Sequence, residues 1–377
     1  MSYVITGGEG FLGWHVRVLM RALGWPAPVL LGRQALTDPK TVSEAMAGAD
    51  VVLHLAGANR GTAADVVAGN VNPAAHLAAG LRRCGTPPKR IVFANSVQSG
   101  NGTPYGDAKA TAADTLAAAA DVGYVLDDVR LPNLYGEHGR PFYNSVVATF
   151  CRVLANGDSP EVHEDRALEL VHVGDAAARL IEAPMTGSWD STMPVLRVGV
   201  RALADRLDEY AADYRSGTIP PLTSRHSVRL FNTYRSHCFP DHYPMPLTPH
   251  SDARGELVEL VRTRAGSGQT YCSTTRAGAT RGEHFHLAKV ERFCVLRGEG
   301  RISLRRVEDD QVLRFPVSGD RPVVVDMPTG WVHHITNTGT ADLVTLFWAN
   351  ELYDPSRPDT YPEPVDQRVV ESVHPAP

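Results

Sequence analysis

Several features that would mark other classes of protein are scarce in this sequence of 377 residues. Cysteine is one of them: there are five, widely spaced, and they form no C-x-x-C pair. An odd number of scattered cysteines argues against a disulfide framework and is typical of reduced thiols in a cytoplasm. We therefore expect a cytoplasmic protein whose thiols are free, at Cys84, Cys151, Cys238, Cys272 and Cys294.

Basic runs and long apolar runs are also missing. The formal net charge is -5 and no segment is rich in Lys and Arg, so we expect neither a nucleic acid nor an anionic membrane as partner. No segment approaches the ~18 consecutive apolar residues of a transmembrane helix. A first strand that begins at Ser2 leaves no room for a signal peptide. With 43% hydrophobic and 21% charged residues, the composition predicts a globular protein of two or three domains.

The N-terminus predicts a dinucleotide-binding site. A buried strand over residues 2–6 runs into a glycine-rich turn, and an apolar-periodic helix follows from Trp14 to about Leu23. Glycines let the backbone approach a pyrophosphate, which then sits on the helix N-terminus. The expected cofactor contacts are Gly7, Gly8, Gly10, Phe11, Leu12 and Gly13.

Arg33 bears on the choice of cofactor. It follows the second expected strand, where an NAD-binding enzyme usually offers a carboxylate to the ribose diol. A guanidinium at that place suits a 2′-phosphate, so we expect NADPH rather than NADH. The alternative is that Arg33 is only a solvated loop charge.

Strands and helices alternate up to about residue 130. Helices are expected near residues 38–47 and 73–83, and strands at 51–55, 90–94 and 124–130. This alternation predicts a Rossmann-type, doubly wound parallel sheet with its ligands at the carboxyl ends of the strands. Residues at or beside those ends are Leu55, Ala56, Gly57, Asn59, Asn70, Ser96 and Asn133.

Tyr105 and Lys109 form a candidate proton-transfer pair. They lie four residues apart on the helix that follows Ser96, so their side chains should be neighbours. The Lys109 charge would favour the phenolate and lower the Tyr105 pKa, while Ser96 would hold the same substrate oxygen. Tyr-x-x-x-Lys alone is weak evidence, since a surface pair of this kind is common on helices.

Together these motifs resemble the extended short-chain dehydrogenase/reductase family. The resemblance implies that Ser96, Tyr105 and Lys109 are catalytic, that Tyr105 and Lys109 also contact the cofactor, and that Asn133 contacts a nucleotide-linked sugar. Dehydratases of the family place Asp-Glu after the catalytic Ser or Thr, whereas Val97-Gln98 stand here, which favours carbonyl reduction. The motifs are Thr6-Gly7-Gly8-x-Gly10-Phe11-Leu12-Gly13, Leu55-Ala56-Gly57, Asn70-Val71, Ser96, Tyr105-x-x-x-Lys109, Arg130-Leu131-Pro132-Asn133 and His172-Val173-Gly174-Asp175.

The middle of the chain is less regular. Helices expected at residues 142–154, 175–181 and 200–214 should build a substrate-side lobe, with Arg140 and Asn144 as candidates for the phosphates or as structural hydrogen-bonders. The Pro- and His-rich stretch 237–250 has irregular spacing and is interpreted as a stiff linker rather than a metal site. We expect a reductase domain over residues 1–243 and a second domain over residues 244–370.

The sequence of the second domain predicts an all-β barrel or jelly roll with a metal site. Short strands alternate with glycine-bearing turns from residue 255 to about 352. His284 and His286 share one face of a strand, Glu291 needs a turn or bulge to join them, and His333 comes from a second hairpin. Three imidazoles and one carboxylate suit Zn, Fe, Mn or Ni. The motifs Gly278-x5-His284-x-His286-x4-Glu291-x6-Gly298 and Pro328-x-Gly330-x2-His333-x3-Asn337 resemble the cupin superfamily, which implies that these four residues bind a metal.

The pairing of the two domains resembles a family of bifunctional capsular-polysaccharide enzymes. It implies a homodimer whose zinc-binding cupin epimerises C3 of a UDP-linked 4-keto-6-deoxy-N-acetylhexosamine, after which the reductase domain reduces C4 with NADPH. Two alternatives remain: a reductase whose cupin is a structural or dimerising module, and a cofactor-binding regulator without turnover. The motifs do not identify the base at C3, for which Lys289 and His334 are candidates. The shared segments are Leu53–Arg60, Asn95–Gln98, Arg130–Asn133, Arg140–Val146, Val317–Asp320 and Asn350–Pro355.

Overall fold

The computed structural model describes residues 1–186 and 193–366. The chain divides into two compact units. The first holds residues 1–153 and 157–205, and the second holds residues 154–156 and the chain from residue 206 onward. Within the described residues no helix is long and apolar enough to cross a bilayer, and all five cysteines are free.

The first unit is built on a five-stranded parallel sheet in the order β2-β1-β3-β4-β5. The expected doubly wound sheet is confirmed. The chain leaves β1 toward β2 on one side and returns to β3 on the other, so the strand order reverses between β1 and β3, which is where this architecture binds its ligands. The strands are β1 (Tyr3–Thr6), β2 (Val29–Leu31), β3 (Val51–His54), β4 (Arg90–Ser96) and β5 (Val125–Leu131).

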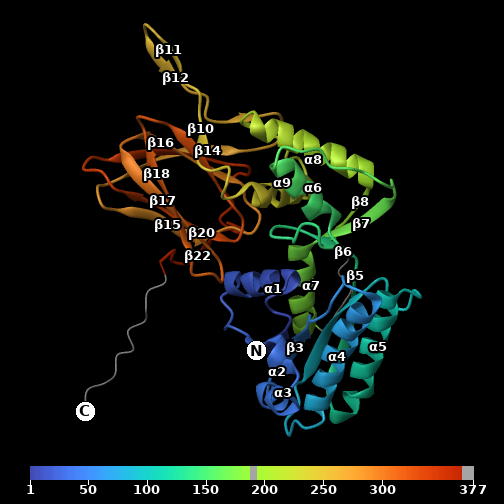
Figure 1. Ribbon diagram of the computed structural model, residues 1–377. Helices are drawn as coiled ribbons and strands as arrows, with labels where there is room; N and C mark the ends of the chain where they lie inside the picture. Colours follow the sequence, from blue (N-terminus) through green and yellow to red (C-terminus); the bar gives the residue numbers. More distant parts are fainter. Residues whose placement is uncertain (187–192, 367–377) are drawn as a thin grey trace, which may run out of the picture. The chain divides into compact units, whose positions relative to one another are not determined.

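Helices cover both faces of this sheet (Figure 1). One buried cluster joins the sheet to α3 (Pro39–Met46), α4 (Ala63–Leu81) and α5 (Pro104–Ala118). A second cluster joins its other face to α1 (Phe11–Ala22) and α7 (Val173–Thr186). The short helices α2 (Arg33–Leu36) and η1 (Ala120–Val122) occupy connections.

Two helix starts differ from expectation. α1 begins at Phe11, directly after the glycine turn, rather than at Trp14. α4 begins at Ala63, ten residues before the expected start at Pro73, because Thr62 and Asp65 form a capping box in which each side chain accepts a hydrogen bond from the other's backbone N–H. Pro73 therefore lies inside the helix, where proline is usually a terminator.

A second, three-stranded sheet follows in the first unit. β6 (Asn133–Tyr135) pairs parallel with β7 (Ala167–His172), and β7 pairs antiparallel with β8 (Val195–Gly199). The helix expected at residues 175–181 is confirmed as α7, and the one expected at 142–154 is present as α6 (Val146–Ala155), which begins four residues later than expected.

The second unit contains two five-stranded sheets whose pairings are all antiparallel, which confirms the expected all-β domain. One sheet has the order β10-β19-β16-β21-β14 and the other β18-β17-β20-β15-β22. Two small pairs accompany them, β11 (His250–Asp252) with β12 (Gly255–Leu257) and β9 (Thr218–Ile219) with β13 (Arg262–Thr263). The ten sheet strands are β10 (Met245–Pro246), β14 (Gln269–Thr275), β15 (Thr280–Phe285), β16 (Glu291–Arg297), β17 (Glu299–Arg306), β18 (Val312–Ser318), β19 (Val323–Met327), β20 (Trp331–Asn337), β21 (Leu343–Ala349) and β22 (Tyr361–Pro362).

The stretch 237–250, expected to be a stiff linker between the domains, is packed into the second unit. Phe239 and Tyr243 are buried, and β10 pairs with β19. The expected helix 200–214 is confirmed as α8 (Val200–Arg215), while α9 (Arg225–Cys238) was not anticipated. Asn232 on α9 donates to the Ala288 carbonyl at 2.6 Å. The linker prediction is therefore wrong here, because apolar side chains in this proline-rich stretch enter the core.

Candidate active site and metal centre

The glycine turn after β1 has the conformation that a dinucleotide cradle needs. Gly7 has φ +71°, and a Cβ on it would lie 2.7 Å from the Ala56 backbone nitrogen. A Cβ on Gly13 would lie 2.3 Å from the Gly7 carbonyl oxygen. Both positions therefore admit only glycine. The backbone stays bare at the N-terminus of α1, where a pyrophosphate is stabilised by N–H groups and the helix dipole.

The end of β3 lies beside this turn, at the point where the strand order reverses. Leu55 donates its backbone N–H to the Thr6 carbonyl at 3.1 Å. A Cβ on Gly57 would lie 2.7 Å from Asn70 Oδ1 and 3.4 Å from Lys109 Nζ. The structure thus brings the Leu55–Gly57 stretch, Asn70 and Lys109 together, although α4 and α5 carry the last two residues.

The Ser96 hydroxyl lies near the Tyr105 phenol and acts on its pKa. Ser96 is the last residue of β4 and is buried, while Tyr105 lies in the first turn of α5, which Thr103 caps by accepting from the Gly106 N–H. Burial raises the pKa of Tyr105, and the nearby Ser96 hydroxyl opposes that rise. The pair can hold one substrate oxygen between two hydroxyl groups.

The expected lowering of the Tyr105 pKa by Lys109 is not observed. Lys109 Nζ donates to the Ala94 carbonyl at 2.8 Å and lies 4.8 Å from the centre of the Phe93 ring. Burial raises the Tyr105 pKa, and the effect that opposes this rise comes from Ser96 and not from Lys109. Burial lowers the pKa of Lys109 itself to about 8, against a smaller opposing effect of Asp128.

The remaining candidates in the first unit are exposed. Arg33 opens α2 directly after β2, and Asn133 opens β6. Arg140 stacks on Tyr143, with its guanidinium carbon 4.7 Å from the ring centre, and Asn144 Nδ2 donates to the Asn59 carbonyl at 3.4 Å. Each of these four side chains is therefore accessible from solvent.

Two residues of that loop adopt left-handed backbone conformations. Phe142 has φ 58° and Asn144 has φ 52°, although neither is glycine. Arg60 hydrogen-bonds to the Phe142 carbonyl and, with the contact from Asn144 to Asn59, ties the loop to the segment after β3. Such strain is retained where the surrounding structure over-determines the backbone, as at binding loops.

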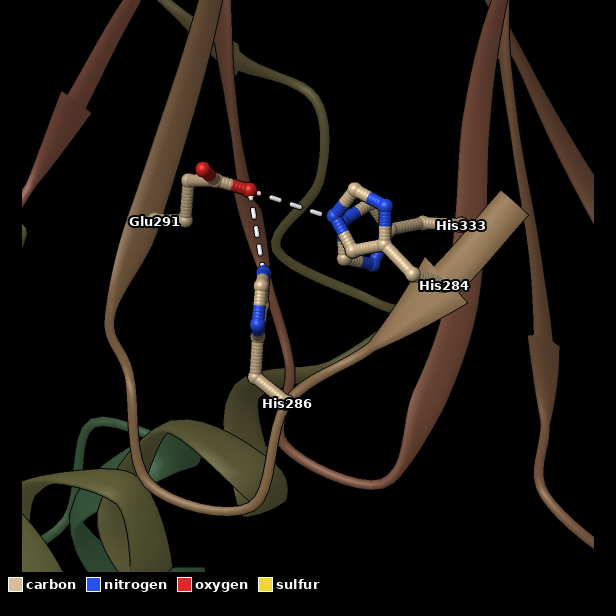
Figure 2. Close-up of side chains that lie close together, drawn as sticks. All are labelled: His284, His286, Glu291 and His333. Carbon is tan, nitrogen blue, oxygen red and sulfur yellow. Dashed lines mark hydrogen bonds and ion pairs between the residues drawn. The ribbon is translucent and has the colours of Figure 1, made fainter. Parts of the chain in front are cut away.

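The four candidate metal ligands meet inside the barrel of the second unit (Figure 2). One ligand atom from each of His284, His286, Glu291 and His333 lies within 4.8 Å of the others. Glu291 Oε2 lies 3.2 Å from His286 Nε2 and 3.4 Å from His333 Nε2. Glu291 was expected to need a turn or bulge in order to face the same way as His284 and His286. The turn between β15 and β16 provides it, since Glu291 is the first residue of β16.

Hydrogen bonds from neighbouring residues orient the ligand side chains toward the centre of the cluster. His286 Nδ1 lies 2.5 Å from the Asp359 carbonyl and His333 Nδ1 lies 3.1 Å from the Trp331 carbonyl, which leaves both Nε2 atoms facing Glu291. Tyr271 donates to the other carboxylate oxygen of Glu291. The sequence did not single out Tyr271 or Asp359, because they belong to no motif and reach the cluster only through tertiary contacts.

The charges of the cluster fit a divalent cation. Burial, followed by the neighbouring imidazoles, lowers the pKa of His284 to about 3, and burial also lowers that of His333. Burial acts against the charge on Glu291, but hydrogen bonds from His286 and His333 hold its pKa well below the ordinary value. His333 Nε2 is buried and has Glu291 Oε2 as its polar neighbour at 3.4 Å. Burial acts to lower the pKa of His286, but the hydrogen bond to Glu291 raises it overall. Two neutral imidazoles beside an ionised carboxylate are protonation states that metal ligation requires.

The two candidates for the base at C3 have other contacts. Lys289 Nζ donates to the Pro358 carbonyl at 2.8 Å, and His334 Nδ1 lies 2.8 Å from Glu283 Oε1. His333 and His334 are adjacent on β20, and neighbouring side chains on a strand point to opposite faces. The side chain of His334 therefore points away from the face that carries His333, and its role as the base stays a prediction.

Comparisons with known proteins cover both halves of the chain. Residues 3–184 match the NAD dependent epimerase/dehydratase family, and residues 250–361 match the polysaccharide biosynthesis C-terminal domain. A Pseudomonas aeruginosa protein named UDP-2-acetamido-2,6-beta-L-arabino-hexul-4-ose reductase is 31% identical over 369 residues, which is 96% of this chain and 98% of that protein.

Solved structures also match along the whole length. The crystal structure of the capsular polysaccharide assembling protein CapF from Staphylococcus aureus is 31% identical with a TM-score of 0.59, and covers 97% of this chain and 100% of its own. A second crystal form of that protein is 30% identical with a TM-score of 0.54 and the same coverage.

Proposed function

The chain belongs to the CapF family, in which an epimerase/dehydratase-type domain precedes a polysaccharide biosynthesis C-terminal domain, and from that membership we propose a bifunctional enzyme acting on a nucleotide-linked 4-keto sugar. The second unit epimerises C3 of a UDP-linked 4-keto-6-deoxy-N-acetylhexosamine, and the first reduces the C4 ketone. The observation that carries the proposal is the convergence of His284, His286, Glu291 and His333 in a chain that also pairs Ser96 with Tyr105.

The reduction is assigned to the site at the end of β4. Ser96 donates a hydrogen bond to the C4 carbonyl oxygen, and Tyr105 delivers a proton to that oxygen as the ketone becomes an alcohol. The glycine turn and the Leu55–Gly57 stretch hold the cofactor, and Arg33 selects NADPH through its 2′-phosphate. Lys109 holds the nicotinamide ribose and returns the proton to Tyr105.

Epimerisation is assigned to the barrel. A ketone at C4 acidifies the C3 proton, which leaves from one face of the ring and is replaced on the other with no net redox change. His284, His286, Glu291 and His333 would hold the metal, proposed to be zinc. When bound, the metal supplies a positive charge that stabilises an enolate, and the nicotinamide supplies a hydride. A homodimer as the working form is proposed from the family alone.

Solvent deuterium uptake tests the assignment. The Tyr105→Phe protein is incubated in deuterated water with the UDP-linked 4-keto sugar and Zn(II) but without NADPH, and C3 is examined by NMR and mass spectrometry. We expect deuterium at C3, and no uptake once His284→Ala is added.

Two other outcomes would contradict the proposal in different ways. If C3 takes up no deuterium while the native protein still oxidises NADPH with this sugar, the chain is a reductase with a structural barrel. If neither reaction occurs, the substrate assignment is wrong.

A further inference from the structure

A C-terminal segment clamps the part of the barrel that carries two of the four candidate ligands. We call residues 358–366 the C-terminal strap. It contacts the chain from Glu283 to Lys289, which includes His284 and His286 and runs into Glu291. Its short strand β22 pairs with β15, with His284 opposite Pro362 and Phe285 opposite Tyr361.

Within the strap, Asp359 contacts both the turn between β15 and β16 and the His286 ring. Its carboxylate accepts three successive backbone N–H groups of the turn between β15 and β16, from Leu287 at 2.9 Å, Ala288 at 2.9 Å and Lys289 at 2.7 Å. Its own carbonyl lies 2.5 Å from His286 Nδ1. One residue therefore fixes both the backbone of the turn and the orientation of the imidazole.

Asp359 adopts an unfavourable conformation to do so. Its φ is +40°, in the left-handed region that non-glycine residues enter at a cost of roughly 1 kcal/mol or more. Such a residue persists only where its contacts outweigh the strain. The three accepted N–H groups supply those contacts.

The strap also holds the backbone on the other side of His284. A β-bulge lies between Gly282 and His284, and Glu283 in it has φ 61°. The Glu283 carbonyl accepts the Glu363 N–H at 2.9 Å, and Glu283 Oε2 accepts the Val365 N–H at 2.6 Å. Bulges beside functional sites re-aim a side chain, and here the re-aimed side chain is His284.

Arg305 anchors the strap to the barrel. Its buried guanidinium donates to Glu363 Oε1 at 2.6 Å and to the carbonyls of Val365 at 2.8 Å and Pro364 at 2.9 Å. Because the planar guanidinium donates several charge-assisted hydrogen bonds in fixed directions, it holds the strap in one orientation. The strap is thus part of the barrel and not a loose end.

We propose that the C-terminal strap sets the metal affinity of the cluster, with Asp359 as its main positioning residue. The carbonyl of Asp359 fixes the His286 tautomer that presents Nε2, and its carboxylate fixes the turn that separates His286 from Glu291. The Nδ1 of His333 is held within its own strand by Trp331, so the strap acts on one side of the cluster. The inference rests on the proposed function, because it takes the cluster to be a metal site.

The test measures Zn(II) affinity of the full chain by competition with a chromophoric chelator, and records the Co(II) absorption spectrum of each variant. We expect Asp359→Ala to bind Zn(II) about 10- to 100-fold more weakly and to change the Co(II) spectrum. The variant keeps the backbone carbonyl but loses the carboxylate that holds the turn, so the carbonyl no longer stays in place to orient His286. Asp359→Asn tolerates the left-handed backbone and keeps one acceptor oxygen, so its affinity should fall in between. Asp366→Ala is the matched control, since Asp366 lies on the strap and, within residues 1–186 and 193–366, its carboxylate pairs with exposed Arg314 rather than with the cluster.

The outcomes separate the two proposals. If Asp359→Ala and Asp359→Asn lower the melting temperature of the metal-free protein but keep native Zn(II) affinity and the native Co(II) spectrum, the strap is merely structural and the inference is overturned. If the native chain binds Zn(II) no better than His284→Ala, the metal site fails, and the inference fails with it.

Discussion

Lys109 donates a 2.8 Å hydrogen bond from its buried ammonium to the backbone carbonyl of Ala94. Burial lowers the pKa of this ammonium from 10.5 to about 8. Between pH 8 and 10.5 the unfolded chain therefore binds more protons at this position than the folded chain. We expect the stability of the cofactor-free protein to gain from this group as the pH rises through that window, by roughly 3 kcal/mol at most.

The measurement is the difference in melting temperature between Lys109→Met and the native protein from pH 7 to 10.5. The variant should be the more stable at pH 7, and the difference should shrink as the pH rises. Other titrating groups largely cancel in this difference. A difference that does not change with pH would show that Lys109 has an ordinary pKa.

Tyr105→Phe removes the proposed proton donor but leaves the aromatic ring that packs in α5. We expect turnover of the keto sugar with NADPH to fall about 100- to 10,000-fold, the usual contribution of a positioned acid. Cofactor affinity, measured by fluorescence titration, should stay within about threefold of native. Reduction at an undiminished rate would remove Tyr105 from the mechanism.

Arg33→Ser tests the choice of cofactor. Arg33 is exposed, so the substitution should leave stability within about 0.5 kcal/mol. Loss of a charge-assisted hydrogen bond to the 2′-phosphate should raise KM for NADPH about 10- to 100-fold while KM for NADH stays unchanged. Equal changes for both cofactors would mean that Arg33 is only a solvated charge.

The sequence could predict the fold where one local signal settled each step. The glycine turn, the strand–helix alternation and the switch to short strands after the proline-rich stretch each reflect local physics. The metal cluster could also be found, because the two His motifs place three imidazoles and Glu291 on strands whose side-chain alternation is known.

What could not be predicted depends on contacts between distant segments. Asp359 lies 73 residues after His286 and contacts it through a backbone carbonyl, which any residue type carries. Lys109 was expected to act on Tyr105, but its ammonium bonds to Ala94, and helix spacing alone gives no information about that acceptor. Pro73 suggested a helix start, and the capping box at Thr62 outweighed it.

Arg292 and Asp326 give the last prediction. They are directly opposite each other on β16 and β19 and form a buried, two-pronged ion pair, with Nε to Oδ1 at 2.6 Å and a second guanidinium nitrogen to Oδ2 at 2.9 Å. Tyr214 on α8 also donates to Asp326 Oδ2, at 2.5 Å. Asp326→Ala leaves the buried Arg292 guanidinium without its carboxylate partner. It should therefore lower the free energy of unfolding by about 3–5 kcal/mol.

The double variant Arg292→Met/Asp326→Leu distinguishes the cost of an unpaired charge from loss of packing. It removes both charges and keeps apolar volume, so it should be closer to native in stability than Asp326→Ala. Urea denaturation of the metal-free chain, followed by tryptophan fluorescence, measures both variants, with Asp366→Ala as an exposed control within about 1 kcal/mol of native. If the double variant is as unstable as Asp326→Ala, the pair itself holds α8 on the barrel through Tyr214, and the unpaired charge contributes little.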